Sequence, residues 1–257
     1  EVVTLPKPGL VDPSDIGPHP DMDVYMFINS SLSLREYFNK AEEIGTTYET
    51  DLKKVFEQLR IQGRMAEKIM FHTTSGVNTH KGAIFSLGIF VCAESYARFN
   101  NVDTFSVIRK MCQGLVKNDL QKNNQNLTAG EQQFIQYGQG GVRQVAQEGY
   151  PIIEKIALPF LKNRQGTTNQ RLLDTLMKIA TVIEDSNLIK RAGNIEVINW
   201  LHQSAEKYLR LGGAETKTGL AYLDKLNKVF KENNYSLGGC ADLLIVTIFM
   251  ALDKGYL

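Results

Sequence analysis

The chain has 257 residues, of which 43% are hydrophobic and 22% charged, and its 29 basic and 28 acidic side chains leave a formal net charge of +1. This composition suits a globular protein with a sizeable core. It lacks the basic excess of a general nucleic-acid or membrane-surface binder, so we expect neither partner. The longest apolar runs, 84–93 and 243–252, fall short of the roughly 18 residues that span a bilayer.

The three cysteines, Cys92, Cys112 and Cys240, are scattered and odd in number. We expect reduced cysteines in the core of a cytoplasmic protein, rather than cysteines that form disulfides or bind a metal. No signal peptide is visible, and the chain opens with Glu1 rather than Met, so we expect residues upstream of Glu1 to be missing.

Residues 1–20 carry five of the seven prolines, which excludes a regular helix there. Asp21 then opens a helical pattern of apolar residues that runs to Phe38. Two shorter helices are predicted over 50–58 and 63–72, and a central apolar helix over 81–99.

Amphipathic spacing predicts further helices over 104–117, 172–184, 195–211, 219–233 and 241–253. Thr128 and Glu131 form a capping-box signature, and Pro151 and Pro159 are expected to start and end a helix. Alternating strand patterns are almost absent. We therefore expect an all-α protein, a single compact domain over 1–257 with about ten helices.

The run Gly-Val-Asn-Thr-His-Lys-Gly at 76–82 precedes the central helix. Thr79 is expected to cap that helix, which puts His80 and Lys81 in its first turn. Basic residues there oppose the helix dipole, so they indicate an anion bound at the free backbone N–H groups. A tight turn with solvated charges is the alternative interpretation.

Acids and a histidine gather in the segment 17–23. Asp21 and Asp23 stand two apart at a helix start, where they either cap the helix or hold a divalent cation. His19 lies between two prolines and is either a surface side chain or a ligand or proton-transfer group.

Two further clusters lie at 184–193 and 238–242. Asp185 is expected at a helix C-terminus, where an acid is unfavourable and needs a reason. Asp242 precedes apolar residues, and a buried acid needs a partner. No Walker loop, dinucleotide-binding glycine motif or nucleophile elbow is present.

At these clusters the chain resembles the triphosphoribosyl-dephospho-CoA synthase family. The most specific segment is Asn-Thr-His-Lys-Gly following Gly-Val, and the matching segments run in the family's order over essentially the whole length. They are Pro6–Asp12, Gly17–Asp23, Gly76–Gly82, Thr128–Glu131, Asp185–Arg191 and Gly238–Leu244.

The resemblance implies an all-α enzyme that joins ATP to 3′-dephospho-CoA and releases adenine. The product is the prosthetic-group precursor of the citrate lyase acyl carrier protein, or of the malonate decarboxylase one, which a holo-transferase loads downstream. In this chemistry the 2′-hydroxyl attacks the anomeric carbon through an oxocarbenium-like state, which carboxylates stabilise and a base assists. The triphosphate needs Mg²⁺ and cationic donors.

On this hypothesis Asp21, Asp23 and Asp242 hold metal, and Asp21 also stabilises the developing cation. His19 or Asp185 is the catalytic base. The substrate-binding candidates are Lys7, Asn78, Thr79, His80, Lys81 and Arg191.

Arginine is usual in the family where this chain has Pro13 and Pro20. The other departures are Ser75 and Ala192 where glycine is usual, Gln144–Val145 where Gly-Glu is common, and Cys240 where serine is usual. Losing two arginines would weaken triphosphate binding or shift substrate preference. A nucleotide-binding protein without turnover and a Mg²⁺-dependent ADP-ribose-type glycohydrolase remain alternatives. The sequence does not determine the oligomeric state or which carrier protein is served.

Overall fold

The structure is a computed structural model that describes residues 1–120, 135, 138 and 140–257. All regular elements in these residues are helices, apart from an isolated bridge between Asp12 and Asp15, so the predicted all-α class is confirmed. The capping box expected at Thr128 and Glu131 lies outside the described residues.

The chain divides into two compact units. Unit 1 comprises Glu1–Phe27 and Ile152–Leu257, and unit 2 comprises Ile28–Pro151. The chain passes from unit 1 into unit 2 within α1 (Val24–Ser33). A single domain over 1–257 stays a prediction.

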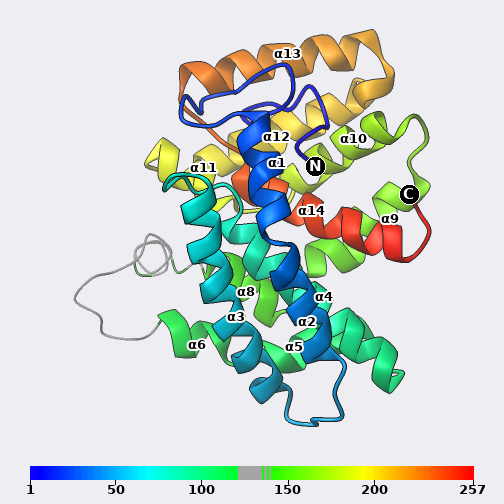
Figure 1. Cartoon of the computed structure of the whole chain (residues 1–257). Coiled ribbons are helices and arrows are strands. Elements are labelled where there is room, and N and C mark those ends of the chain that lie inside the picture. The colour runs from blue at the N-terminus through cyan, green and yellow to red at the C-terminus, as the bar shows by residue number, and fades with distance from the viewer. Residues whose placement is uncertain (121–134, 136–137, 139) are drawn as a thin grey trace. The chain divides into compact units, whose positions relative to one another are not determined.

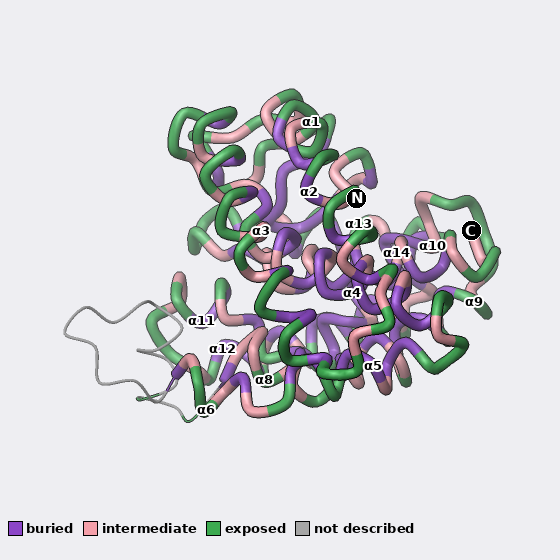
Figure 2. Tube along the Cα trace, turned by 60° about the horizontal axis from the view of Figure 1, so that its bottom comes forward, coloured by how far each residue is buried: buried purple, intermediate pink, exposed green. Residues whose placement is uncertain are grey.

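Unit 2 is built around α4 (Lys81–Asn100), the central helix that the sequence predicted over 81–99. Helix α4 packs against its neighbours α2, α3 and α5 (Figure 1). Its interior positions are buried along most of its length, as the purple trace in Figure 2 shows. The other helices of this unit are α2 (Arg35–Gly45), α3 (Leu52–Thr73), α5 (Thr104–Met111), α6 (Leu115–Leu120) and α8 (Gly141–Gln147).

Helix α4 is also long and apolar enough to cross a membrane by length and composition. However, 56% of the window that meets this test is buried inside the protein. A core helix passes the same test, so the finding is weak support for a membrane span.

Unit 1 centres on α10 (Thr168–Ala180), which packs against α12 and α14. Its fully buried Asp174 accepts hydrogen bonds from the Tyr208 hydroxyl at 2.7 Å and Arg164 Nε at 2.6 Å. The other elements are the π-helix η1 (Ile153–Ala157), α9 (Leu158–Asn163), α11 (Ser186–Ala192), α12 (Val197–Arg210), the short 3₁₀ turn η2 (Gly213–Glu215), α13 (Lys217–Glu232) and α14 (Gly238–Asp253).

The proline-rich segment at 1–20 is irregular, as predicted, and it is held to unit 1 by side-chain hydrogen bonds. Asn227 of α13 accepts from Gly9 N and donates to Asp15, and Lys231 pairs with Asp15 at 2.8 Å. Figure 1 shows this segment running beside α13. The segment is therefore an integral part of unit 1.

Several predicted helix boundaries were wrong. Residues 50–58 and 63–72 form one helix, α3, with Gly63 in its interior. The region 104–117 breaks into α5 and α6. Pro159 does not end a helix, because it stands in the first turn of α9, where a proline is tolerated. Just before it, the Leu158 N–H bonds to Ile153 O in the π-type register of η1.

Candidate active site

His19 and Arg191, both predicted from sequence, meet in unit 1. Arg191 Nη2 lies 3.1 Å from His19 Nδ1, and His19 Nε2 lies 3.1 Å from Ser236 Oγ. Because a guanidinium can only donate, Nδ1 is the acceptor and the neutral imidazole carries its hydrogen on Nε2. Both ring nitrogens are therefore engaged with protein groups.

The electrostatics of this His19–Arg191 cluster favour neutral His19. Burial and the Arg191 charge lower the pKa of His19, and a hydrogen bond to the Gly9 backbone and the Asp21 charge oppose them. The exposed Asp21 carboxylate also acts on Arg191, whose pKa is lowered by burial. Three residues predicted for the site thus influence one another.

The guanidinium of Arg191 is anchored by acceptors of the protein itself. Nη1 donates to Pro18 O at 3.2 Å, to Asn234 O at 3.1 Å and to Asn234 Oδ1 at 2.7 Å. Arg191 thereby ties the last turn of α11 to two loops. These contacts give Arg191 a structural role, and phosphate binding by it stays a prediction.

Asp185 does not end a helix, which corrects the sequence interpretation. Helix α10 ends at Ala180, and Asp185 is the N-cap of α11. Its Oδ1 accepts from Asn187 N at 2.9 Å and Leu188 N at 3.2 Å, and its Oδ2 accepts from Cys240 N in α14 at 2.9 Å.

The Asp185 carboxylate therefore caps two helices at once and is completely buried. Burial raises the pKa of Asp185, and the backbone hydrogen bonds, from Cys240 above all, oppose that rise. A carboxylate at two helix starts has the sign that the dipoles favour. This arrangement favours a structural function for Asp185, and its predicted role as a base stays untested.

The three acids predicted to hold metal do not appear as one cluster. Asp23 Oδ1 accepts from Met26 N at 2.7 Å at the start of α1, and Asp242 lies in the first turns of α14 beside Cys240. Over residues 1–120 and 140–257 no group of three or more His, Cys, Asp or Glu side chains could hold a metal ion.

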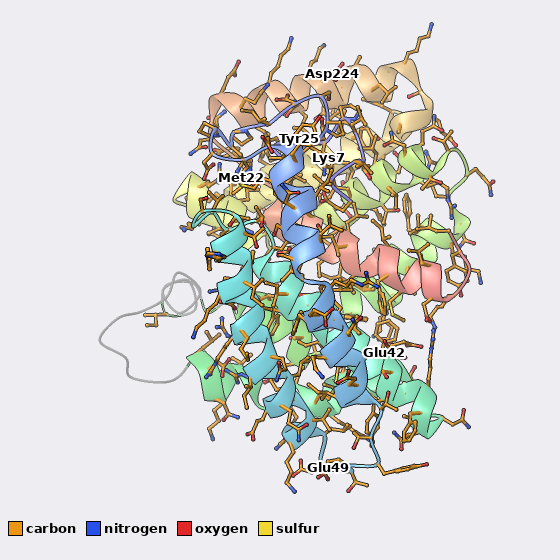
Figure 3. All side chains as sticks on the ribbon, in the orientation of Figure 1. Lys7, Met22, Tyr25, Glu42, Glu49 and Asp224 are labelled. Carbon is orange, nitrogen blue, oxygen red and sulfur yellow. The ribbon has the colours of Figure 1, made fainter. Side chains whose placement is uncertain are left out.

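Lys7, labelled in Figure 3, lies inside the N-terminal segment with only 1% of its side chain exposed. Its Nζ donates to Glu1 O at 3.1 Å and to Glu1 Oε1 at 2.6 Å. Its backbone N–H donates to Asp12 Oδ2 at 2.9 Å. These contacts leave Lys7 poorly placed to reach a phosphate.

The second candidate cluster lies in unit 2, where α1 meets the turn before α4. Ser30 Oγ lies 2.8 Å from His80 Nδ1 and 2.7 Å from Thr79 Oγ1, and Ser31 Oγ lies 3.3 Å from His80 Nε2. The His80 N–H donates to Met70 Sδ at 3.2 Å. We call these side chains, with Lys81, the His80 cluster.

The cap of α4 differs from the prediction. Asn78, rather than Thr79, accepts the Lys81 N–H through Oδ1 at 3.1 Å, and the N-cap residue is His80. The Thr79 hydroxyl turns instead to Ser30 and His80. The motif residues thus organise a histidine at the helix start.

Lys81 extends from the first turn of α4, and 54% of its side chain is exposed. It pairs with Glu67 of α3 at 3.1 Å. An exposed pair of this kind contributes little stability. Its ammonium group is therefore available to an anion at low cost.

Sequence reasoning missed Ser30, Ser31, Asn234 and Ser236. Ser30 and Ser31 form a pair of polar residues inside a short helix, which is an available signal. Nothing in the sequence showed that their partner is 50 residues away. Asn234 and Ser236 are marked only by their position before the glycines of α14.

The described residues form an all-α protein in which histidine, lysine and capping amides stand at helix starts, where an anion would be favoured. A model of the ATP:dephospho-CoA triphosphoribosyl transferase family (CitG) matches residues 1–256. The chain belongs to this family and is therefore a transferase. No solved structure matches it.

Three relatives illustrate the similarity. The chain is 49% identical over 263 residues to a "probable 2-(5''-triphosphoribosyl)-3'-dephosphocoenzyme-A synthase" of Lactiplantibacillus plantarum, covering 100% of this chain and 94% of that protein. It is 52% identical to "Protein CitXG" of Leuconostoc mesenteroides, with 100% of this chain and 57% of that protein covered. A synthase of Citrobacter koseri, also named probable, is 37% identical, with 98% and 86% covered.

Proposed function

We propose that the protein transfers the 5-triphosphoribosyl group of ATP to the 2′-hydroxyl of 3′-dephospho-CoA and releases adenine. The observation that carries this proposal is the family match over residues 1–256. The relative at 49% identity, whose name contains the product of this reaction, supports it.

The first turn of α4 is the candidate site for the triphosphate. Lys81 supplies a half-exposed cation, and the exposed Asn78 uses its oxygen for the cap, which leaves its amide hydrogens to donate. Helix α4 spans Lys81–Asn100, so its full dipole adds to the attraction. We assign Lys7 and Arg191 to structure, because protein acceptors already hold both side chains.

Mg²⁺ is proposed as the companion of ATP. Mg²⁺ at phosphates typically takes one or two carboxylates and completes its shell with phosphate oxygens and water. The exposed Asp21 and Asp23 fit that requirement, whereas a cage of protein ligands alone is absent from the described part of the chain. The ion would neutralise phosphate charge, and Asp21 stays the residue proposed from sequence to stabilise the developing cation.

The product is proposed to serve the citrate lyase acyl carrier protein in the cytoplasm, after transfer by a downstream holo-transferase. The similarity to a protein named CitXG supports the citrate lyase assignment. The malonate decarboxylase carrier is the alternative. Loading of one purified carrier and not the other, in a coupled assay, would decide between them.

The deciding experiment incubates the protein with ATP, Mg²⁺ and 3′-dephospho-CoA and measures adenine by chromatography. Adenine that appears only with dephospho-CoA supports the transfer reaction. Adenine without dephospho-CoA would indicate a glycohydrolase. Folded protein that releases none would contradict the proposal and favour a nucleotide-binding protein without turnover.

A variant tests the proposed role of Asp21. Asp21→Asn should abolish most adenine release while the circular dichroism spectrum stays that of the wild type. Glu36→Gln, an exposed acid in the first turn of α2, is the matched control and should keep full activity. Normal turnover by Asp21→Asn would refute the role.

A further inference from the structure

Two arginines from different helices of unit 2 share the carboxylate of Asp119 in α6. Arg60 of α3 donates from Nη1 to Oδ1 at 2.9 Å and from Nη2 to Oδ2 at 3.1 Å. Arg143 of α8 donates from Nε to Oδ2 at 3.2 Å. The Asp119 side chain is only 10% exposed, whereas 34% of Arg60 and 32% of Arg143 are exposed. Two cations therefore surround one anion, and one positive charge is left unbalanced.

The terminal nitrogens of Arg143 remain available to a ligand. An arginine has five N–H donors in a planar fork. Arg143 uses its Nε alone, and within the described residues neither Nη1 nor Nη2 has an acceptor. Arg191 differs, because its Nη1 and Nη2 already donate to Pro18, Asn234 and His19. The criterion that assigns Arg191 to structure thus leaves Arg143 able to bind.

Arg60 holds the shared carboxylate in place. Both of its terminal nitrogens contact Asp119, a two-point contact that fixes the orientation of both groups. The guanidinium carbon of Arg60 also lies 5.6 Å from the ring centre of Phe56, a buried residue one turn earlier in α3. Asp119 in turn holds the Nε of Arg143. Arg143 is therefore oriented before a ligand arrives, which lowers the entropy cost of binding.

Helix α3 connects this arginine pair with the first turn of α4. Glu67, the partner of Lys81, lies seven residues after Arg60, so both positions share one face of α3 and stand about 10 Å apart along it. Arg64 lies between them on the same face; it is exposed and makes no ion pair with any described residue. Unit 2 thus has two cationic places, joined by one helix face.

The proposed reaction needs two places for phosphate. ATP and 3′-dephospho-CoA each carry a phosphate chain on the 5′ carbon of a ribose. The reacting atoms are the anomeric carbon of one ribose and the 2′-oxygen of the other, so the two phosphate chains are separated by two sugar rings. The distance along α3 is of this order. The first turn of α4 accounts for only one of the two chains.

We propose that Arg143, oriented by Asp119 and Arg60, binds the phosphate chain of one of the two nucleotide substrates through Nη1 and Nη2. The inference rests on the proposed function. A guanidinium fork matches two phosphate oxygens with parallel N–H bonds, which a lysine cannot reproduce. The unbalanced charge of the arginine pair adds to the attraction. The first turn of α4 then binds the other phosphate chain.

Calorimetric titration with each substrate alone tests this proposal without turnover. Arg143→Gln should bind one substrate roughly 10- to 100-fold more weakly than the wild type, the effect of losing a charge-assisted contact. The dissociation constant of the other substrate should stay within about twofold, because salt largely screens a charge about 10 Å away. Weaker binding of ATP would identify the triphosphate as the ligand, and weaker binding of dephospho-CoA the diphosphate.

Two variants separate binding from structure. Arg98→Gln removes another arginine of unit 2, which pairs with Glu94 within α4, and should leave both dissociation constants unchanged. Arg143→Lys keeps the charge without the fork, so its affinity for the sensitive substrate should fall between those of Arg143→Gln and the wild type. A purely structural Arg143 would lower the melting temperature of Arg143→Gln and leave both affinities unchanged.

The proposal is overturned if Arg143→Gln binds both substrates as the wild type does, if it loses affinity for both equally, or if the wild type binds neither. If Arg143→Gln does not fold, the Arg143→Lys titrations decide in its place. Failure of the proposed function is a separate result. A wild type that binds both substrates but releases no adenine would refute the reaction, while the titrations still decide whether Arg143 binds a phosphate chain.

Discussion

Arg191 donates to Nδ1 of His19 at 3.1 Å across 172 residues of sequence, and the contact selects the neutral form of the histidine. A protonated imidazole would lose this acceptor and face the guanidinium charge at close range. The pKa of His19 is accordingly lowered by burial and by Arg191. The pair links protonation to the stability of unit 1.

This linkage predicts a loss of stability at mildly acidic pH. A histidine in the unfolded chain has a pKa of about 6.5, and the pKa of His19 in the folded protein lies below that value. As the pH falls through this range, the unfolded chain therefore binds more protons than the folded protein does. The free energy of unfolding should therefore decrease from pH 7 toward pH 5 and level off below the folded pKa. Urea denaturation at several pH values measures this.

The control for the pH prediction is His19→Asn, which cannot take up the proton. Its stability should vary less than that of the wild type between pH 7 and 5. Identical slopes for both proteins would show that His19 does not carry the effect. His72, which is exposed, provides a second comparison through His72→Asn.

Arg191→Lys should destabilise the protein although it preserves charge. A lysine ammonium cannot reproduce the forked geometry that reaches Pro18 O, Asn234 and His19 together. We expect a loss of about 1–3 kcal/mol, because the buried His19 ring and the half-buried Pro18 carbonyl lose their donor. Thermal unfolding measures it, with Lys190→Ala at the exposed neighbouring position as the control. Equal melting temperatures for the two variants would contradict the assignment.

The sequence predicts the fold class well, because the fold class depends on local patterns, whereas the predicted roles of the site residues stay predictions. Apolar spacing located α4, and capping or basic residues at helix starts marked His19, Asp21, His80 and Arg191. Interactions across long sequence separations could not be predicted this way. Ser30 is an ordinary helical serine until the fold places it beside His80.

Asp185 shows a second limit of local reasoning. The sequence suggested an acid at a helix C-terminus, but α10 ends five residues earlier, at Ala180, and a new helix begins. Its second function, as the cap for Cys240 N, depends on α14 and is invisible from the neighbouring residues. A residue that looked unfavourable for stability is a double cap.

The double cap predicts a large stability cost for Asp185→Ala. Three backbone N–H groups lose their acceptor, two in α11 and one in α14. One lost cap costs about 0.5–2 kcal/mol, so the combined loss should be roughly 2–4 kcal/mol. Chemical denaturation measures it. Glu184→Ala, at the exposed preceding position, should change stability by less than about 0.5 kcal/mol.

Two glycines near one tyrosine predict opposite effects of the same substitution. A Cβ on Gly63 of α3 would lie 3.5 Å from the Tyr37 hydroxyl, an ordinary contact, whereas a Cβ on Gly88 of α4 would clash with that hydroxyl. Gly63→Ala should stabilise the protein by about 0.5–1 kcal/mol, because alanine favours a helix interior. Gly88→Ala should cost about 1–3 kcal/mol, since Tyr37 would have to move and would lose its hydrogen bond to Ile84 O. Melting temperatures of the two variants measure both effects, and a stabilised Gly88→Ala would mean that α2 and α4 pack less closely than this structure shows.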